Sequence, residues 1–290
     1  MSADINIGII GGSGLYKMQG VKLIREVSIK TPFGSPSDAI MVTEIGDVTV
    51  AFLSRHGRGH IHSPTEVPYR ANIYALKKMG VDRIISVSAC GSLKENLEPG
   101  HFVIPDQVFD FTHQRARSFF GDGWVVHISV PDPYCPMLSS EVADAVEESG
   151  GKVHRGGQFI TIEGPRFSTK SESRVFRSWG MDIIGMTASP EAFLAREAGI
   201  CYATIAHITD YDVWHDAESP VTVEMVVQQL QTNVKTAQQA IRNLLPKLDQ
   251  MDLEACGCHA SLENASITNP NQIPEETREK LELIARRESN

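Results

Sequence analysis

The segment ANIYALKKMGVDRIISVSACGS, residues 71–92, decides the fold class. Its first part, residues 71–79, predicts a helix that ends at Gly80, and residues 83–88 predict a buried strand because they are rich in β-branched side chains. A helix followed at once by an apolar strand is typical of a sheet that carries helices on its faces. The segment therefore predicts an α/β protein.

The same alternation continues outward from this segment in both directions. Further strands are expected at residues 5–10, 48–53, 101–104, 157–162, 182–186 and 201–207, and further helices at residues 141–149, 170–179, 190–198 and 221–245. The last of these helices is expected to end before Pro246. From about residue 250 the composition becomes polar. We therefore expect a catalytic domain over residues 1–250 and a C-terminal extension over residues 251–290, with a helix at 275–286, that could fold over the core.

The composition excludes several classes of function. The chain has 290 residues, a hydrophobic content of 41% and a net charge of −9. An acidic surface repels nucleic acid and anionic membranes, so neither is expected as a partner. No stretch approaches the roughly 20 apolar residues that span a bilayer, and the first residues lack the basic segment of a secretion signal. A cytoplasmic location is expected.

The five cysteines are an odd number, which argues against a framework of disulfides in such a chain. Cys256, Cys258 and His259 are three soft metal ligands close together, but the local sequence offers no fourth ligand. We therefore expect no metal site and reduced thiols on the C-terminal tail.

Polar residues follow several predicted strands, which is where α/β proteins bind their ligands. Ser13 lies in the turn GGSG, which suits an anion but is explained equally well as a plain tight turn. Arg55 and His56 begin the run RHGRGH, where the fork of an arginine suits phosphate, although a solvated loop is the alternative. Ser88 could complete a phosphate site or simply satisfy a turn.

Asp210 and Asp212 follow the strand expected at residues 201–207. Residues two apart in an extended segment point the same way, so both carboxyls could meet one edge of a ligand. Neighbouring carboxylates raise one another's pKa, which can keep one of them protonated as a general acid. A helix N-cap and a pair of metal ligands are the alternatives, and the metal reading lacks further oxygen ligands.

Taken together and in order, these clusters resemble the family of trimeric purine nucleoside phosphorylases and methylthioadenosine phosphorylases. The similar segments are residues 8–14, 31–34, 55–57, 88–92, 161–168 and 186–187, and the similarity runs from about residue 5 to residue 245. The resemblance implies a single domain of the nucleoside phosphorylase fold, with a mixed central sheet flanked by helices on both faces. It also implies a homotrimer, or a dimer of trimers.

The resemblance implies a phosphate site at Ser13, Arg55, His56, Ser88, Ala89 and Thr187. It implies a nucleoside site at Phe167, Ser168, Met186, Asp210 and Asp212. Within it, Phe167 could stack on the purine and Met186 could lie against the sugar. An apolar pocket for a 5′-methylthio group would be lined by Val223 and Val226, which share one helix face, and by His127 of a neighbouring subunit.

The catalytic residues implied are Asp210 and Asp212, which also select the base. Adenine carries an N6 donor and an N7 acceptor, so a protonated Asp210 can donate to N7 while carboxylate oxygens accept from N6. The family's enzymes for 6-oxopurines typically present an asparagine there, and a mismatched edge leaves buried polar groups unpaired. The resemblance thus implies phosphorolysis of 5′-methylthioadenosine, a reaction of methionine and purine salvage, with inorganic phosphate as co-substrate and no cofactor or metal.

Three alternatives remain open at this stage. The substrate could be methylthioinosine or a broader range of purine nucleosides, or the chain could be an inactive protein that binds nucleosides or anions. A dinucleotide-dependent dehydrogenase is disfavoured because the glycine-rich turn does not fit G-x-G-x-x-G. The resemblance also implies that disulfides could join Cys256 to Cys258 and Cys135 to Cys201, as in some thermophilic relatives.

Overall fold

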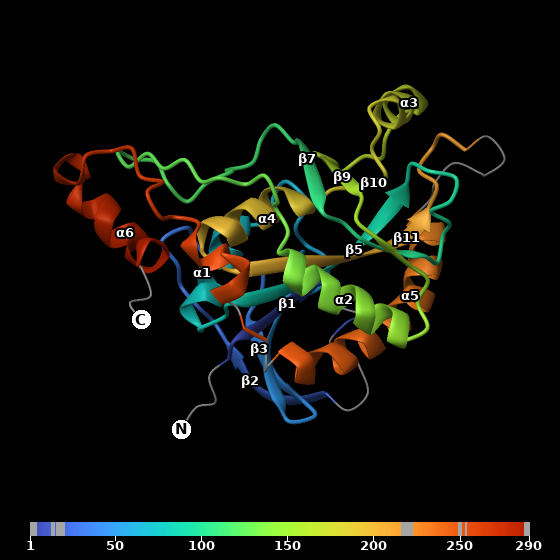
Figure 1. Cartoon of the computed structure of the whole chain (residues 1–290), viewed down its shortest axis with the longest axis horizontal. Coiled ribbons are helices and arrows are strands. Elements are labelled where there is room, and N and C mark those ends of the chain that lie inside the picture. The colour runs from blue at the N-terminus through green and yellow to red at the C-terminus, as the bar shows by residue number, and fades with distance from the viewer. Residues whose placement is uncertain are drawn as a thin grey trace.

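The structure is a computed structural model that describes residues 5–12, 15, 21–215, 223–248, 251–252 and 254–286 (Figure 1). The side chains of residues 223–232 and 254 are not part of this description. The expected roles of Ser13 and of the Val223 and Val226 side chains therefore lie outside the described residues.

One mixed sheet forms the centre of the described chain. Its strands are β1 (Ile7–Gly11), β2 (Val21–Val27), β3 (Ile40–Ile45), β4 (Val48–Ser54), β5 (Arg83–Ser92), β6 (Phe102–Ile104), β7 (Gln107–Phe111), β8 (Val153–Arg155), β9 (Gln158–Ile162), β10 (Ile183–Gly185) and β11 (Cys201–Asp210). The order along the sheet is β2-β3-β4-β1-β5-β10-β9-β7, while β11 pairs with β5 and β6, and β6 pairs with β8. Because β1 runs parallel to β4 and β2 antiparallel to β3, the expected mixed sheet is confirmed.

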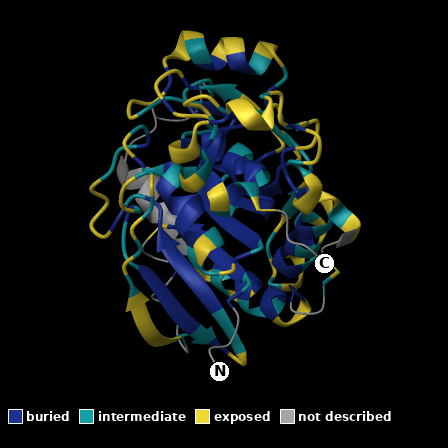
Figure 2. Ribbon diagram, turned by 90° about the vertical axis from the view of Figure 1, so that its left-hand side faces the viewer, coloured by how far each residue is buried: buried dark blue, intermediate teal, exposed yellow. Residues whose placement is uncertain are grey.

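Helices cover both faces of this sheet, as expected (Figure 1). On one face lie α2 (Pro136–Glu148) and α5 (Val223–Leu248), and on the other lie α1 (Tyr69–Lys78) and α4 (Ala188–Glu197). Each face has its own apolar core, and the strands between them are buried, including every residue of β11 (Figure 2). The short helix α3 (Lys170–Ser178) stands at one end of the molecule. Among the described helices, none is long and apolar enough to cross a bilayer.

The strand β5 forks the sheet and creates the opening where the site lies. Its pairing with β1 ends at Ser86, and its pairing with β10 begins only at Gly91, whereas β11 accompanies it along the other edge. The peptide groups between these two points are thus free of strand partners on one edge of β5 in the described sheet. We expected Ser88 and Ala89 to follow the end of a strand. Instead, β5 continues to Ser92 and places both residues within the fork.

Two helix boundaries differ from expectation for reasons that involve proline. The helix α5 contains Pro246 in its last turn and extends to Leu248. The helix α2 begins at Pro136, five positions before the expected start at residue 141, since proline is well suited to the first turn of a helix.

The segment after residue 250 packs on the rest of the chain. The helix α6 (Glu275–Ala285) lies against α1 and buries Leu281 and Ile284 in the core of that face. Further back, Ile267 N–H donates to Val125 O at 2.9 Å, and Trp124 Nε1 donates to Ser266 Oγ at 3.0 Å. The C-terminal segment is thus attached at two places, and the domain boundary near residue 250 stays a prediction.

We predict that Leu281→Ala lowers the free energy of unfolding by about 2–5 kcal/mol, because it removes a side chain that is only 1% exposed and leaves a cavity. Thermal or urea unfolding measures this change. Glu279→Ala, in the same helix but exposed, is the matched control and should be nearly neutral. Equal stability of the two variants would show that α6 adds nothing to the core.

Candidate active site

Arg55 follows β4 and is buried against the fork of β5. Its guanidinium forms a bidentate ion pair with Glu191 of α4, with Nε and Nη2 each 2.8 Å from a carboxylate oxygen. Nη2 also donates to Ser86 Oγ at 2.6 Å, and Nη1 donates to Val87 O at 3.1 Å. Burial opposes the charged guanidinium, but Glu191 overcomes this and raises the pKa of Arg55 above its usual value. The Tyr202 hydroxyl donates to the same carboxylate at 2.7 Å.

This arrangement changes the role expected for Arg55. We expected its fork to hold phosphate, but the four bonds above occupy four of the five N–H groups that a guanidinium has. One Nη1 hydrogen is left for a ligand. The charge of the guanidinium is balanced by Glu191, a residue that the sequence analysis did not single out because it lies 136 positions away.

His56 is a neutral acceptor rather than a second cation. Its Nδ1 lies 2.9 Å from His62 O, and a carbonyl only accepts, so Nδ1 carries the proton and Nε2 keeps a lone pair. Burial first, and then the charge of Arg55, lower the pKa of His56 to about 4. Arg58, from the same run, is exposed and pairs with Glu26, so the later part of that run is a surface loop.

The hydroxyls of Ser88 and Thr187 meet across the fork. Ser88 Oγ lies 3.4 Å from Thr187 Oγ1, although the two residues belong to β5 and to the N-cap of α4. Val87 O faces the open edge, where Arg55 reaches it. Since the peptide groups of residues two apart face the same edge of a strand, Ala89 presents its peptide N–H there as well. Arg55, Ser88, Ala89 and Thr187 are thus brought together, as the sequence predicted.

Asp210 and Asp212 are brought together by a turn. We expected an extended segment, but Asp210 ends β11 and Asp212 adopts a left-handed conformation with φ of 52°. Asp212 N–H donates to Asp210 Oδ1 at 2.8 Å, and Thr209 Oγ1 donates to Asp210 Oδ2 at 2.7 Å. Gly91 makes room for this turn, because a Cβ there would lie 2.9 Å from Asp210 Oδ1.

Both carboxyls have features of a proton donor. Burial raises the pKa of Asp210 despite its two hydrogen bonds. Burial also raises the pKa of Asp212, to about 6, and the neighbouring Asp210 acts in the same direction. Asp212 Oδ2 is buried and forms no hydrogen bond of ordinary geometry within the described structure, although the Ser173 hydroxyl lies close enough to lower the pKa of this carboxyl. It is therefore the carboxyl oxygen that a ligand can satisfy.

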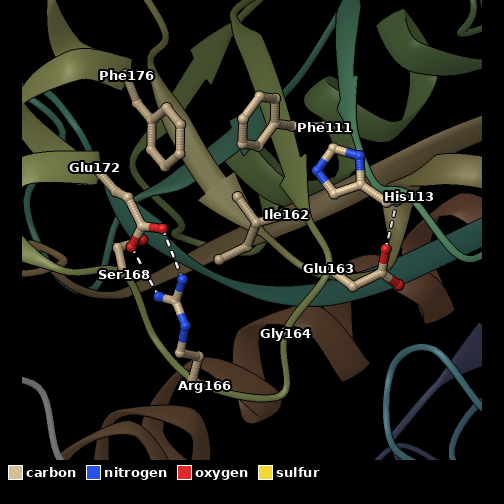
Figure 3. Close-up of a pocket in the computed structure, with 9 residues that line it drawn as sticks. All are labelled: Phe111, His113, Ile162, Glu163, Gly164, Arg166, Ser168, Glu172 and Phe176. Atoms are coloured by element: carbon tan, nitrogen blue, oxygen red, sulfur yellow. Dashed lines mark hydrogen bonds and ion pairs between the residues drawn. The ribbon is translucent and has the colours of Figure 1, made fainter.

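A pocket with a cavity volume of about 130 Å³ lies at the end of the molecule near α3 (Figure 3). Phe111, Ile162 and Phe176 form an apolar wall, and Arg166 and Glu172 form an ion pair at 2.7 Å (Figure 3). The remaining lining residues are His113, Glu163, Gly164 and Ser168. Such a mixture of apolar walls and a few polar groups suits a small organic ligand.

The pocket and the fork are connected through Met186. A Cβ at Gly164, in the pocket lining, would lie 2.6 Å from Met186 Sδ, and Thr187 follows Met186 directly. Arg115 fixes this junction, since its Nη1 donates to Met186 O at 2.6 Å and to Ser189 O at 2.7 Å. The sequence analysis missed Arg115 because all its partners are distant in the sequence.

Two residues expected at the nucleoside site do not line this pocket in the described chain, and their roles stay predictions. Phe167 is 39% exposed between the lining residues Arg166 and Ser168. The aromatic side chains that line the pocket are Phe111 and Phe176. Their positions on β7 and α3 give no local motif that could have identified them. His127 is exposed on the strip beside the C-terminal segment, where its N–H donates to Ala265 O at 2.9 Å.

Comparisons with known proteins identify the family of this chain. The family model of the phosphorylase superfamily matches residues 6–246. S-methyl-5′-thioadenosine phosphorylase of Geobacter sulfurreducens is 51% identical over 96% of this chain and 97% of the relative, and that of Koribacter versatilis is 49% identical over 96% and 94%.

Solved structures give the same result. A methylthioadenosine phosphorylase from an antarctic soil metagenomic library superposes with a TM-score of 0.92 at 47% identity, covering 97% of this chain and 99% of that one. Methylthioadenosine phosphorylase from Schistosoma mansoni in complex with adenine superposes with a TM-score of 0.86 at 36% identity, covering 91% and 99%. This chain therefore belongs to the phosphorylase superfamily, as a member of its methylthioadenosine phosphorylases.

Proposed function

We propose that this protein is a pentosyltransferase that cleaves 5′-methylthioadenosine with inorganic phosphate, giving adenine and 5-methylthioribose 1-phosphate. The observation that carries the proposal is the buried pair Asp210 and Asp212. Burial raises the pKa of both carboxyls, and Asp212 Oδ2 forms no hydrogen bond of ordinary geometry in the described structure. Relatives named for the same nucleoside, and a relative described in complex with adenine, support this choice of base.

Phosphate binds in the fork of β5. The hydroxyls of Ser88 and Thr187, the Ala89 amide and the remaining Nη1 hydrogen of Arg55 donate to its oxygens. His56 Nε2 accepts a hydrogen bond from the phosphate hydroxyl. Because Glu191 balances Arg55, oriented donors rather than net positive charge hold the anion. Ser13, which lies outside the described residues, is proposed as a further phosphate ligand.

The reaction exchanges one bond at C1′ for another. As the bond from C1′ to N9 breaks, its electron pair passes into the purine, and a phosphate oxygen bonds to C1′. The carboxyl pair donates its proton to N7 and accepts a hydrogen bond from the N6 amino group, which makes adenine a better leaving group. The pair regains a proton from solvent, and the phosphate proton leaves through His56 or water. The chain's own contribution is positioning and electrostatics, so we propose no cofactor or metal in the reaction.

We further propose that the protein is a homotrimer in which His127 enters the neighbouring subunit's pocket, with Val223 and Val226 forming the rest of the methylthio site. Three large apolar side chains near the pocket are exposed: Phe109 on β7 at 42%, Val175 on α3 at 40%, and Trp179 directly after α3 at 48%. The rings of Phe109 and Trp179 lie 5.8 Å apart. Exposed apolar groups of this kind favour contact with another chain. The five cysteines form no disulfide with one another in the described structure, which suits a reducing compartment, and we propose a cytoplasmic location.

Purified protein should release adenine from methylthioadenosine only when phosphate is present, and faster than it cleaves methylthioinosine. Asp210→Asn and Asp212→Asn should each lower kcat/KM for methylthioadenosine by about 100-fold or more, because the proton for N7 is lost. Asp144→Asn is the control, because this carboxyl on α2 is 45% exposed and pairs with Arg155 instead of facing the site. A preference for methylthioinosine in the unaltered protein would overturn the assignment of the base but not that of the phosphate site.

The ratio of kcat/KM for the unaltered protein to kcat/KM for Asp212→Asn should decrease as the pH rises above about 6. Because the pKa of Asp212 is raised to about 6, the protonated acid is abundant below this pH and falls about tenfold per pH unit above it. The ratio of the two kcat/KM values cancels the ionisation of phosphate, which both proteins share. A ratio that stays constant from about pH 5 to about pH 8 would exclude Asp212 from the titrating pair.

Light scattering should give three times the 31.9 kDa mass of the chain. His127→Ala should raise KM for methylthioadenosine several-fold while changing kcat little, since it removes a contact to the 5′ substituent rather than to the reacting atoms. The exposed His259→Ala is the control. A fully active monomer would refute the shared site.

A further inference from the structure

Four of the five cysteines meet at one point, far from the substrate pocket. The sulfur atoms of Cys135, Cys201, Cys256 and Cys258 all lie within 4.8 Å of one another. Three of these residues are buried and Cys256 is half-buried. Cys201 begins β11 and Asp210 ends it, so the cluster lies at the opposite end of that strand, about 30 Å from the acid pair.

Elements from three parts of the chain build this cluster. Cys135 precedes α2, and its N–H donates to Tyr202 O at 2.9 Å, which sets it beside the start of β11. In the tail, Gly257 has a φ of 67°, and this left-handed residue turns Cys256 and Cys258 toward the same centre.

The tail is held in this position by contacts outside the cluster. Ser261 Oγ donates to Arg196 O at 2.5 Å, and the main chain of His259 packs against Gly199, at 3.5 Å from the position of a Cβ there. His259, one of the three soft ligands noted in the sequence, is exposed and takes no part. The fold instead supplies the missing ligands from Cys135 and Cys201.

The spacing of the sulfurs suits one tetrahedral metal ion. Metal–sulfur bonds of about 2.3 Å place the four sulfurs of a zinc tetrathiolate about 3.8 Å apart. The Cys201 and Cys256 sulfurs lie 3.2 Å apart, and no two of the four sulfurs are more than 4.8 Å apart. The tetrathiolate spacing of about 3.8 Å lies between these two distances. Four protein ligands leave no open position, which is the arrangement of a structural site rather than a catalytic one.

The surroundings suit the negative charge of such a site. The N-terminus of α2 points at the cluster, because Cys135 is the N-cap residue of that helix. Arg196 adds a positive charge near Cys258. We propose that Cys135, Cys201, Cys256 and Cys258 bind one Zn²⁺ ion, which fastens the C-terminal segment to the start of β11 and to α2.

Metal analysis of the full chain tests this proposal. The protein is purified with a phosphine reductant and without chelators, then given Zn²⁺ and separated from the excess. We expect one zinc per chain by mass spectrometry, and an intense absorption band typical of tetrahedral thiolate when Co²⁺ replaces zinc. The double variant Cys256→Ser with Cys258→Ser should lose the metal, and its Tm should fall by about 5 °C or more.

Two matched variants control for local disturbance. His259→Ala removes the neighbouring soft ligand, and Cys90→Ser removes the cysteine outside the cluster, so both should keep one zinc per chain. Two results would overturn the proposal. One is a chain that takes up no zinc although all its thiols are reduced. The other is a chain that contains no metal when it is purified and whose mass is four hydrogens too low, which would mean two disulfides.

Discussion

The buried ion pair between Arg55 and Glu191 is the interaction on which the site depends. It joins the end of β4 to α4, and through Ser86, Val87 and Tyr202 it also holds β5 and β11. Both side chains are almost inaccessible to water, at 3% and 0% exposure, so the loss of either partner would leave an unpaired charge in the interior. The pair therefore fixes the walls of the fork, and its one spare N–H is held in a set direction. A site of this kind can hold an anion with little net charge of its own.

Much of the fold was predictable because its signals are local. Residues 71–92 contain a helix, a stop and an apolar strand in sequence, and the structure has α1 and β5 there. The strands β2, β3, β7 and β8 were not expected. β2 has five exposed residues in a row and β8 is three residues long, so neither shows the apolar run by which the buried strands were identified. We expected α5 to end before Pro246, but the helix extends to Leu248 and contains the proline in its last turn.

The site was predictable in its chemistry and less so in its geometry. The motifs located Arg55, Ser88, Thr187 and the two aspartates, but not the partners that determine how they act. The ion pair with Glu191 leaves Arg55 only one N–H for a ligand, although we expected its whole fork to bind phosphate. The hydrogen bond from His56 Nδ1 to His62 O leaves Nε2 of His56 as an acceptor. The left-handed turn at Asp212, rather than strand alternation, brings the carboxyls together. These features depend on residues that are distant in the sequence or on a backbone conformation that no motif specifies.

The contact between Trp124 and Ser266 joins residues 142 positions apart, and this has a consequence for synthesis on the ribosome. The strip that carries His127 emerges early, but its neighbour at residues 265–268 emerges only when the chain is almost complete. The acid pair, the fork of β5 and both apolar cores can form before then, apart from the contribution of α6. A nascent chain can thus hold a folded sheet while the edge that bears His127 is still unsupported, so that this edge matures only after the whole polypeptide has been released.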